Sequence, residues 1–183
     1  MRMIEMKKIT ILVTITLAVT TVSAQYSAVR TNAVGWLMAT PNLGLDVAVS
    51  PRWSVEGCAY WNPFITGDFR TIAWGVSLGT RYWRFEPHVG KFLGLHVAGG
   101  RYDVGGKIWH YEGFFTGVGA SYGYSWLLRT RWNLTAEMGI GCFYSKDRKL
   151  KYAYGDCEDI YIYHYQRIVL APSRCEFSVS YLF

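Results

Sequence analysis

The residues with the clearest potential for chemistry are three acidic side chains, Asp46, Glu56 and Glu137. Two carboxylates that flank a sugar bond are the acid and base of most glycoside hydrolases. The alternative is structural, because carboxylates inside a narrow polar interior are costly unless a basic residue pairs with them. Arg81 would supply that basic residue, and His96 is a further candidate member. We expect the structural network of these five residues, with no cofactor and no metal.

The four histidines give little support to a hydrolytic enzyme. His88 lies in a predicted turn, His96 in a predicted strand, and His110 and His164 in predicted loops. No serine stands in the sequence of a nucleophile elbow. A small barrel that modifies lipid A would need a Ser or His system at the rim facing the membrane. The sequence therefore predicts a protein that is not an enzyme, with lipid modification as the less favoured alternative.

Four cysteines, Cys58, Cys142, Cys157 and Cys175, allow up to two disulfides. Cys157 and Cys175 flank the most polar stretch of the chain, so the sequence favours that pair. Neither a CxxC motif nor the Cys/His spacing of a zinc site is present.

The longest predicted loop carries a basic run and a tyrosine-rich stretch. The basic run could attract the phosphates of lipopolysaccharide, and the alternative is a solvated loop. The tyrosines either serve adhesion, since Tyr gives contact area at a small loss of entropy, or extend the last two strands. The basic residues are Lys146, Arg148, Lys149 and Lys151, and the tyrosines are Tyr152, Tyr154, Tyr161, Tyr163 and Tyr165.

The N-terminal segment has the composition of a cleaved secretory signal. Three basic residues precede an apolar run over residues 9–19, and small residues at 22–24 precede a predicted cut before Gln25. The apolar run is too short to span about 30 Å of hydrocarbon. The predicted organisation is a signal peptide over residues 1–24 and a single domain over residues 25–183.

Composition narrows the class of that domain. The formal net charge of +6 is modest and does not argue for nucleic acid as a partner. The chain has 8 Trp, 14 Tyr and 9 Phe, which is a heavy aromatic load for a small soluble domain. A closed barrel that faces lipid uses such a load, because its outside is apolar and its rims favour amphipathic rings.

Period-2 alternation between turn signals predicts an all-β fold of eight antiparallel strands. In the last seven residues, four apolar residues alternate with Ser178, Ser180 and Leu182, and the sequence stops on Phe183. This pattern is typical of the closing strand of an up-and-down transmembrane β-barrel. The predicted strands are 28–37, 43–49, 53–61, 72–83, 89–99, 112–128, 132–144 and a last strand that ends at residue 183.

The connections alternate between short and long, as they do in bacterial barrels with short periplasmic turns and longer outer loops. Turns at 50–52, 84–88 and 129–131 are short, and the predicted loops at 62–71, 100–111 and 145–173 are long. Outward aromatics beside the short turns would then form a girdle at the periplasmic rim. They are Trp53, Tyr82, Trp126, Trp132, Tyr181 and Phe183.

Four segments carry a resemblance to a known family. They are TNAVGWLMATPNLGLDVAVSPRWSVEG, GTRYWRFEPHVGKFLGLHVAGGRYD, YEGFFTGVGASYGYSWLLRTRWNLTAEMGIG and the closing SVSYLF. The chain resembles an uncharacterised family of Bacteroidota outer-membrane β-barrel proteins, classed as a domain of unknown function. It departs from the family pattern at Gly79, where Glu is common, and at Lys91, where His is common. The resemblance implies a fold and a location but no activity and no catalytic residues.

The expected function is that of a small outer-membrane barrel of structural or surface-interaction type in a Gram-negative bacterium. Eight strands enclose an interior just wide enough for side chains to fill, so a small channel is the alternative and a soluble lipocalin-like binder a further one. The expected partners are outer-membrane lipid and lipopolysaccharide, together with the barrel-insertion machinery through the C-terminal strand. The facing of the first strand stays open.

Overall fold

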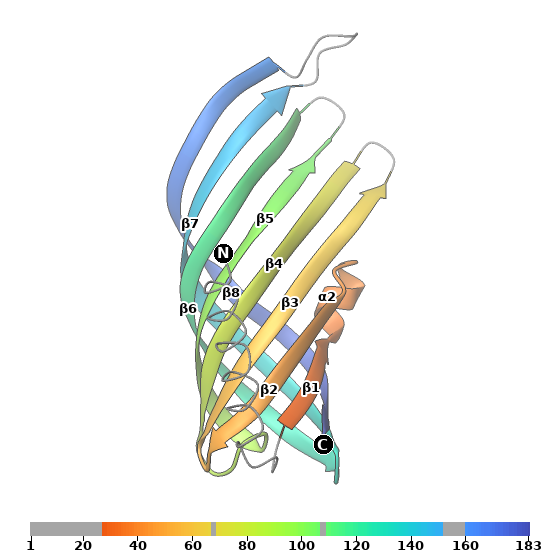
Figure 1. Ribbon diagram of the computed structural model, residues 1–183, viewed down its shortest axis with the longest axis vertical. Coiled ribbons are helices and arrows are strands. Elements are labelled where there is room, and N and C mark those ends of the chain that lie inside the picture. The colour runs from red at the N-terminus through yellow and green to blue at the C-terminus, as the bar shows by residue number, and fades with distance from the viewer. Residues whose placement is uncertain (1–26, 67–68, 107–108, 152–159) are drawn as a thin grey trace, which may run out of the picture.

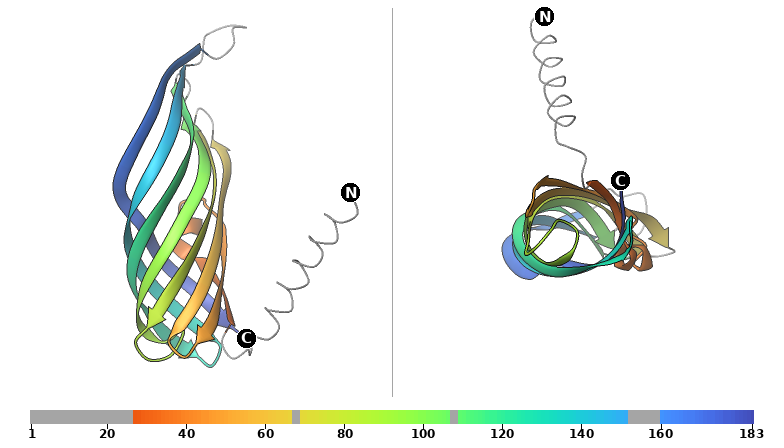
Figure 2. Two further views of the ribbon diagram at one scale, coloured as in Figure 1. Left: turned by 60° about the vertical axis from the view of Figure 1, so that its left-hand side comes forward. Right: turned by 90° about the horizontal axis from the view of Figure 1, so that it is seen from below.

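The chain folds into one ring-like sheet of eight antiparallel strands (Figure 1). A computed structural model describes residues 27–66, 69–106, 109–151 and 160–183, so the predicted signal peptide lies outside the described residues. Each strand pairs with its neighbour in sequence, and β1 also pairs with β8, which closes the ring (Figure 2). The prediction of eight antiparallel strands is confirmed. The elements are β1 (Ser27–Asn32), α2 (Ala33–Leu37), β2 (Asn42–Ser50), β3 (Trp53–Thr66), β4 (Phe69–Trp83), β5 (Gly90–Gly105), β6 (Trp109–Arg129), β7 (Trp132–Lys151) and β8 (Ile160–Leu182).

The first strand is shorter than predicted, because β1 ends at Asn32 and the helix α2 replaces its second half. The Asn32 side chain caps α2 by accepting a hydrogen bond from the Val34 amide at 3.0 Å. The Asn42 side chain accepts from the Asn32 amide at 2.7 Å and donates to the Asn32 carbonyl at 3.1 Å. These bonds satisfy backbone groups that a longer strand would have paired, so the prediction of a strand over 28–37 is wrong beyond residue 32.

The long connections predicted at 62–71, 100–111 and 145–173 are mostly strand, which corrects those loop predictions. β3 and β4 pair up to Thr66 and Phe69, and β7 and β8 pair up to Lys151 and Ile160. Polar residues in these extensions lack the apolar alternation that marks a half-buried strand, and the sequence therefore resembles loop. Pro63 is tolerated within β3 because β2 no longer pairs with β3 beyond Tyr60, so the missing N–H of the proline costs no hydrogen bond to β2.

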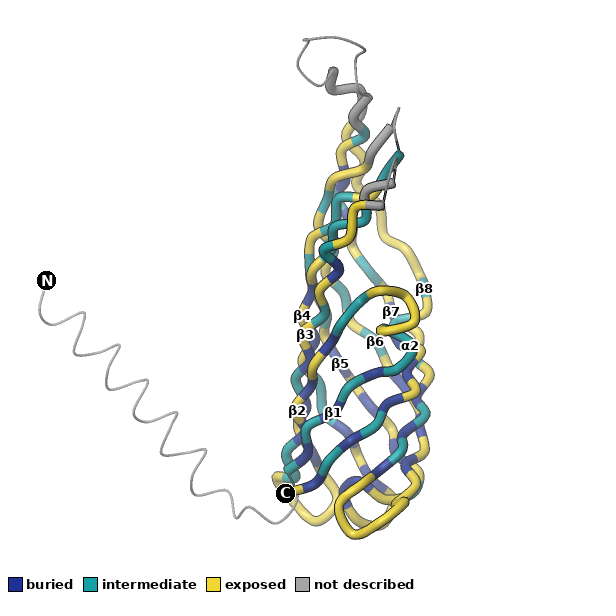
Figure 3. The backbone as a smooth tube through the Cα atoms, turned by 90° about the vertical axis from the view of Figure 1, so that its right-hand side faces the viewer, coloured by how far each residue is buried: buried dark blue, intermediate teal, exposed yellow. Residues whose placement is uncertain are grey.

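Buried and exposed residues alternate along much of each strand (Figure 3), as the period-2 pattern of the sequence predicts. The inward positions are mostly polar and buried, and the outward positions are mostly apolar and exposed. Trp83 and Phe92 are the large apolar side chains that are almost fully buried among the described residues. The interior of this sheet is thus polar over most of its length.

The two ends of the ring differ. At the short-turn end, which carries the three short turns together with Ser27 and Phe183, all eight strands take part. At the long-strand end β1 and β2 are absent, because their pairing stops at Ser178 of β8 and Tyr60 of β3. Above these residues β3 and β8 are not paired with each other, and α2 lies between them (Figure 3).

Within the described part of the chain, no helix has both the length and the apolar character needed to cross a membrane.

Candidate functional site: a buried charge network and the cavity above it

Arg81 of β4 brings together four of the five residues predicted to share an inner network. Its Nη1 donates to Asp46 Oδ2 at 2.6 Å, and its Nη2 contacts Glu56 Oε2 at 2.8 Å. The same Nη2 donates to Glu137 Oε2. All four side chains are buried, so each charge is neutralised by contact rather than by water.

Two further arginines, Arg30 of β1 and Arg174 of β8, complete the network. Arg30 donates to Glu56 Oε2 and to Glu176 Oε2, both at 2.6 Å. Arg174 Nη1 donates to Glu137 Oε1 at 2.9 Å and also contacts Glu56 Oε1. Glu56 therefore meets all three guanidinium groups, and the network ties strands on opposite sides of the ring together.

Sequence reasoning missed Arg30, Arg174 and Glu176 for identifiable reasons. The facing of the first strand was open, so Arg30 had no assigned side. Arg174 and Glu176 share the parity of Ser178, Ser180 and Leu182, so extending that alternation two steps back would have placed both inside.

Two hydroxyl groups donate further hydrogen bonds to the carboxylates. Ser121 donates to Glu137 Oε1 at 2.6 Å, and the Tyr60 hydroxyl donates to Glu176 Oε1 at 2.8 Å. The network formed by Arg30, Arg81, Arg174, Asp46, Glu56, Glu137 and Glu176 thus holds three guanidinium groups and four carboxylates.

His96, the fifth residue predicted for the network, is buried beside it without a hydrogen bond to it. Its side chain comes from β5, and the residue is 5% exposed. Neither ring nitrogen makes a hydrogen bond within the described part of the chain. The ring lies over Gly119, where a Cβ atom would come within 2.5 Å of His96 Nε2. Across the described residues, no group of three or more His, Cys, Asp or Glu side chains is arranged to hold a metal ion.

A compact aromatic group closes the short-turn end of the ring. The rings of Trp83 and Phe92 lie 4.6 Å apart between centroids, and the His88 ring lies 5.6 Å from Trp83. Trp83 Nε1 donates to Ser54 Oγ at 2.9 Å, and the Arg81 guanidinium stands 4.8 Å from the Phe92 ring. The turn between β4 and β5 folds inward to place His88, whose φ is 67°. We call Trp83, His88 and Phe92 the aromatic plug.

A cavity of about 300 Å³ lies on the other side of the network, toward the long-strand end. Phe115 and Phe143 form part of its wall, with ring centroids 6.1 Å apart in an edge-to-face arrangement. His96, Ser173 and Arg174 also line it. From the short-turn end to the long-strand end, the interior therefore contains the aromatic plug, then the charge network and then a partly apolar cavity.

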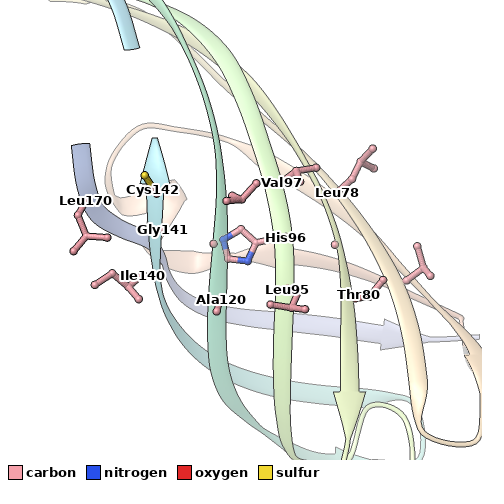
Figure 4. A pocket seen from close by; sticks show the side chains of 14 residues that line it. Leu78, Thr80, Leu95, His96, Val97, Ala120, Ile140, Gly141, Cys142 and Leu170 are labelled. Carbon is pink, nitrogen blue, oxygen red and sulfur yellow. The ribbon is translucent and has the colours of Figure 1, made fainter. Parts of the chain in front are cut away.

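The outer surface is apolar over much of its height. At mid-height a shallow hollow of about 820 Å³ is lined by outward side chains such as Leu78, Val97 and Ile140, and His96 approaches it from within (Figure 4). Mid-height outward residues of this kind are half-exposed or more, including Leu78 at 61%. A soluble protein rarely leaves a continuous apolar surface of this extent in water.

Aromatic residues flank the apolar surface at both ends. At the short-turn end, Trp53 and Tyr82 are opposite in register with ring centroids 5.1 Å apart, and Trp132 and Tyr181 pair at 5.2 Å. A second group of outward aromatics, which the sequence does not predict as a belt, lies toward the long-strand end. Its members are Trp61, Trp74, Phe114 and Tyr144.

The other two residues predicted for the girdle also lie at the short-turn end. Trp126 packs against Tyr124 with ring centroids 4.8 Å apart. Phe183 is 61% exposed, and its amide donates to the Ser27 carbonyl at 3.0 Å. The chain therefore ends beside β1, where the ring closes.

The predicted basic run lies on the extended part of β7 rather than in a loop. Lys149 stands over the Tyr111 ring at 5.7 Å. The neighbouring buried Asp147 accepts hydrogen bonds from Ser145 at 2.8 Å and from the exposed Arg167 at 3.1 Å.

The predicted tyrosine stretch lies partly on β8, where Tyr161, Tyr163 and Tyr165 extend the strand. Tyr152 and Tyr154 lie outside the described residues.

The predicted Cys157–Cys175 disulfide involves a residue outside the described residues, because Cys157 is not among them. Cys175 carries an exposed free thiol opposite Met138, far along β8 from Ile160. Fifteen strand residues span about 50 Å, and a disulfide requires Cα atoms within about 7 Å. The length of β8 therefore disfavours this pairing, which stays a prediction.

A family model described as "Protein of unknown function (DUF3575)" matches residues 9–183. Neither the curated proteins nor the solved structures include a match to this sequence.

Proposed function

Because the chain belongs to the DUF3575 family of proteins of unknown function, we propose its function from its own residues. It is a small outer-membrane β-barrel of structural or surface-interaction type, exported by a cleaved signal peptide over residues 1–24. It is not an enzyme, and its host is a Gram-negative bacterium, with Bacteroidota favoured by the sequence resemblance.

The observation that carries the proposal is the reversal of polarity across the sheet. The charged network is buried inside, while outward residues such as Leu78, Leu95 and Ile140 remain more than half exposed. In water this arrangement would leave apolar surface without a partner. In a bilayer it is favourable, because the closed ladder satisfies backbone groups and lipid covers the apolar face.

Two aromatic belts, the girdle at the short-turn end and the group of Trp61, Trp74, Phe114 and Tyr144 toward the long-strand end, support an orientation and a set of partners. The belt with Trp53 and Trp132 lies beside the short turns, which bacterial barrels keep in the periplasm. The long-strand end then projects from the cell surface, where Lys146 and Arg148 of β7 would meet lipopolysaccharide phosphates. The terminal strand, ending at Phe183, is the segment that the barrel-insertion machinery would engage.

Membrane fractionation with a gel-mobility assay tests this proposal. The full-length chain, expressed in a Gram-negative host, should sediment with outer membranes and resist carbonate extraction. It should also migrate differently in SDS before and after boiling. A mature protein that stays in the aqueous fraction, with no change of mobility on heating, would contradict the membrane assignment.

A channel is the alternative function, and the interior argues against it. The aromatic plug and the charge network fill successive levels of the ring, with Trp83 and Arg81 almost fully buried. Planar-bilayer recording of the purified protein should therefore show no stable conductance steps. Regular steps that persist across preparations would favour the channel.

The four carboxylates also argue against a hydrolase. Each of these four is held by at least one guanidinium group, so the network clamps strands together and none of the four is free to face a substrate. Modification of lipid A, the other enzymatic alternative, is tested separately. Lipid A incubated with the protein should keep all its acyl chains, as measured by mass spectrometry.

A further inference from the structure

The cavity above the charge network combines an apolar wall with a polar floor. The wall includes Phe115, Phe143 and Pro172, and the floor includes His96, Ser173 and Arg174. Its volume of about 300 Å³ lies at the lower end of the range for small-molecule pockets. Such a surface suits a ligand with an alkyl body and a compact polar head.

A bulge in β8 builds the floor. Ile140 pairs with Pro172 and Gly139 with Arg174, so Ser173 is the extra residue. A bulge re-aims side chains, and here two successive residues, Ser173 and Arg174, both line the cavity. Arg174 continues into the charge network, while Ser173 Oγ makes no hydrogen bond within the described residues.

His96 adds two more polar atoms without a hydrogen bond. His96 Nε2 and Ser173 Oγ border the same space over Gly119, where a Cβ atom would lie 2.5 Å from the nitrogen and 2.7 Å from the oxygen. Buried polar groups are nearly always hydrogen-bonded, so these two atoms at one space call for a polar group beside them. Since a neutral imidazole offers one donor and one acceptor, and a hydroxyl offers both, a hydroxyl head group is complementary.

Charge decides between a neutral and an anionic head group. With the imidazole neutral, four carboxylates face three guanidinium groups beneath the floor. A carboxylate ligand would enlarge this excess of negative charge in a buried site, which is unfavourable. A neutral head group avoids that repulsion.

The cavity lies at the level where β3 and β8 are no longer bridged by β1 and β2, and α2 lies between the two strands there. The cavity is lined by Tyr60 of β3 and by Pro172 and Ser173 of β8, which stand where these strands lose their partners β1 and β2. Thr40, just before β2, lines it as well. A lipid-like molecule that entered sideways would pass α2 and Thr40 rather than the aromatic plug.

We propose that this cavity binds a single-chain neutral amphiphile with a hydroxyl head group, of the monoacylglycerol type. The head is held by His96 and Ser173, and the chain lies against Phe115 and Phe143. The sideways route rests on the proposed membrane location, whereas the binding site itself does not.

Photocrosslinking tests the inference. The mature protein in phosphatidylcholine nanodiscs is incubated with a monoacylglycerol that carries a diazirine in its chain, and labelled residues are assigned by tandem mass spectrometry. Label is expected at inward residues such as Phe115 and Phe143. Monoolein should compete at a concentration at least ten times lower than oleate.

Matched variants separate specific binding from partition into lipid. Ala98→Phe fills the cavity and should abolish inward labelling, whereas Ala136→Phe on the outward face of β7 should leave it unchanged. His96→Leu and Ser173→Ala should each weaken it about tenfold. Folding of every variant is checked by heat-dependent mobility, and Ser173→Ala serves if the larger changes prevent folding.

Three results would overturn the inference. Labelling confined to outward residues, equal labelling of Ala98→Phe and wild type, or competition by oleate as strong as that by monoolein would each do so. Failure of the wild-type protein to insert into nanodiscs would instead contradict the proposed membrane function, so the two failures are distinguishable.

Discussion

The short-turn end and the long-strand end of this protein use the same sheet in different ways. At the short-turn end eight strands close the ring, and the plug and the charge network fill it. At the long-strand end six strands continue with β3 and β8 unpaired to each other, and the interior holds a cavity. Closure of the ring and filling of its interior therefore coincide at the short-turn end.

The charge network explains why closure matters. Arg30 of β1 reaches Glu56 of β3 and Glu176 of β8. Removing β1, the strand that closes the ring, would therefore break its ion pairs to both of these strands. The ion pairs are strong only where water is excluded. At the long-strand end no described strand joins β3 to β8. The Arg167–Asp147 ion pair at that end has one exposed partner.

The largest expected effect comes from breaking this network. Arg81→Ala leaves Asp46, Glu56 and Glu137 short of a partner in the interior, and loss of one partner of a buried ion pair costs about 3–5 kcal/mol. Arg167→Ala removes a pair whose arginine is 60% exposed, and should cost about 0–1 kcal/mol. Urea unfolding of both variants in detergent, followed by tryptophan fluorescence, measures the difference. Equal losses of unfolding free energy would contradict the division between the two ends.

The next comparison concerns the outer face. Leu78 lies midway along β4 between Tyr82 and Trp74 of the two aromatic belts, whereas Ile65 lies four residues beyond Trp61 on β3. Both side chains are about equally exposed, at 61% and 62%. Leu78→Arg should destabilise the protein in vesicles by about 2–4 kcal/mol, and Ile65→Arg by about 0–1 kcal/mol, because the cost of a charge falls with distance from the bilayer midplane.

Detergent-free unfolding in phosphatidylcholine vesicles gives both values for the outer face. Similar costs for Leu78→Arg and Ile65→Arg would show that the membrane does not lie between the two belts.

The same contrast explains what could be predicted from sequence. Strand number, the facing of the strands after the first, and the inward side of Asp46, Glu56, Arg81 and Glu137 follow from period-2 alternation, because one face is apolar at the short-turn end. The extensions of β3 to β8 lack that alternation, and so they were predicted as loops. Backbone pairing defines these extensions, and it leaves little trace in side-chain pattern.

Two backbone features that the sequence does not predict, the early end of β1 and the bulge in β8, have local causes. Asn32 and Asn42 bond to each other across the α2 segment, which ends β1 early, and this contact joins residues ten apart with no periodic signal. The bulge at Ser173 shifts the parity of β8, so the alternation that holds at Ser178 fails above Arg174. A bulge of one residue cannot be located from alternation alone.

A third comparison probes packing inside the ring. Ala28 is 1% exposed at the closed end, whereas Ala98 lines the cavity. Ala28→Leu should cost about 1–3 kcal/mol, because extra methyl groups in a filled interior force side chains and backbone apart. Ala98→Leu should cost less than about 1 kcal/mol, since the cavity receives the added atoms. Unfolding free energies from the same urea titration test this, and a larger cost at Ala98 would mean that the cavity is closed in solution.

The smallest expected effects compare the two aromatic belts. Trp53 and Tyr82 are directly opposite on β3 and β4 with ring centroids 5.1 Å apart, whereas Phe114 and Tyr144 are diagonal neighbours 6.2 Å apart. Double-mutant cycles to alanine should give a coupling energy of about 1 kcal/mol for the first pair and about 0.5 kcal/mol for the second. Both belts face lipid headgroups in the proposed orientation, so the difference reports ring geometry rather than depth. A coupling energy at Phe114–Tyr144 equal to or above that at Trp53–Tyr82 would mean that the long-strand end is held as firmly as the closed end, and the contrast between them would fail at the outer surface.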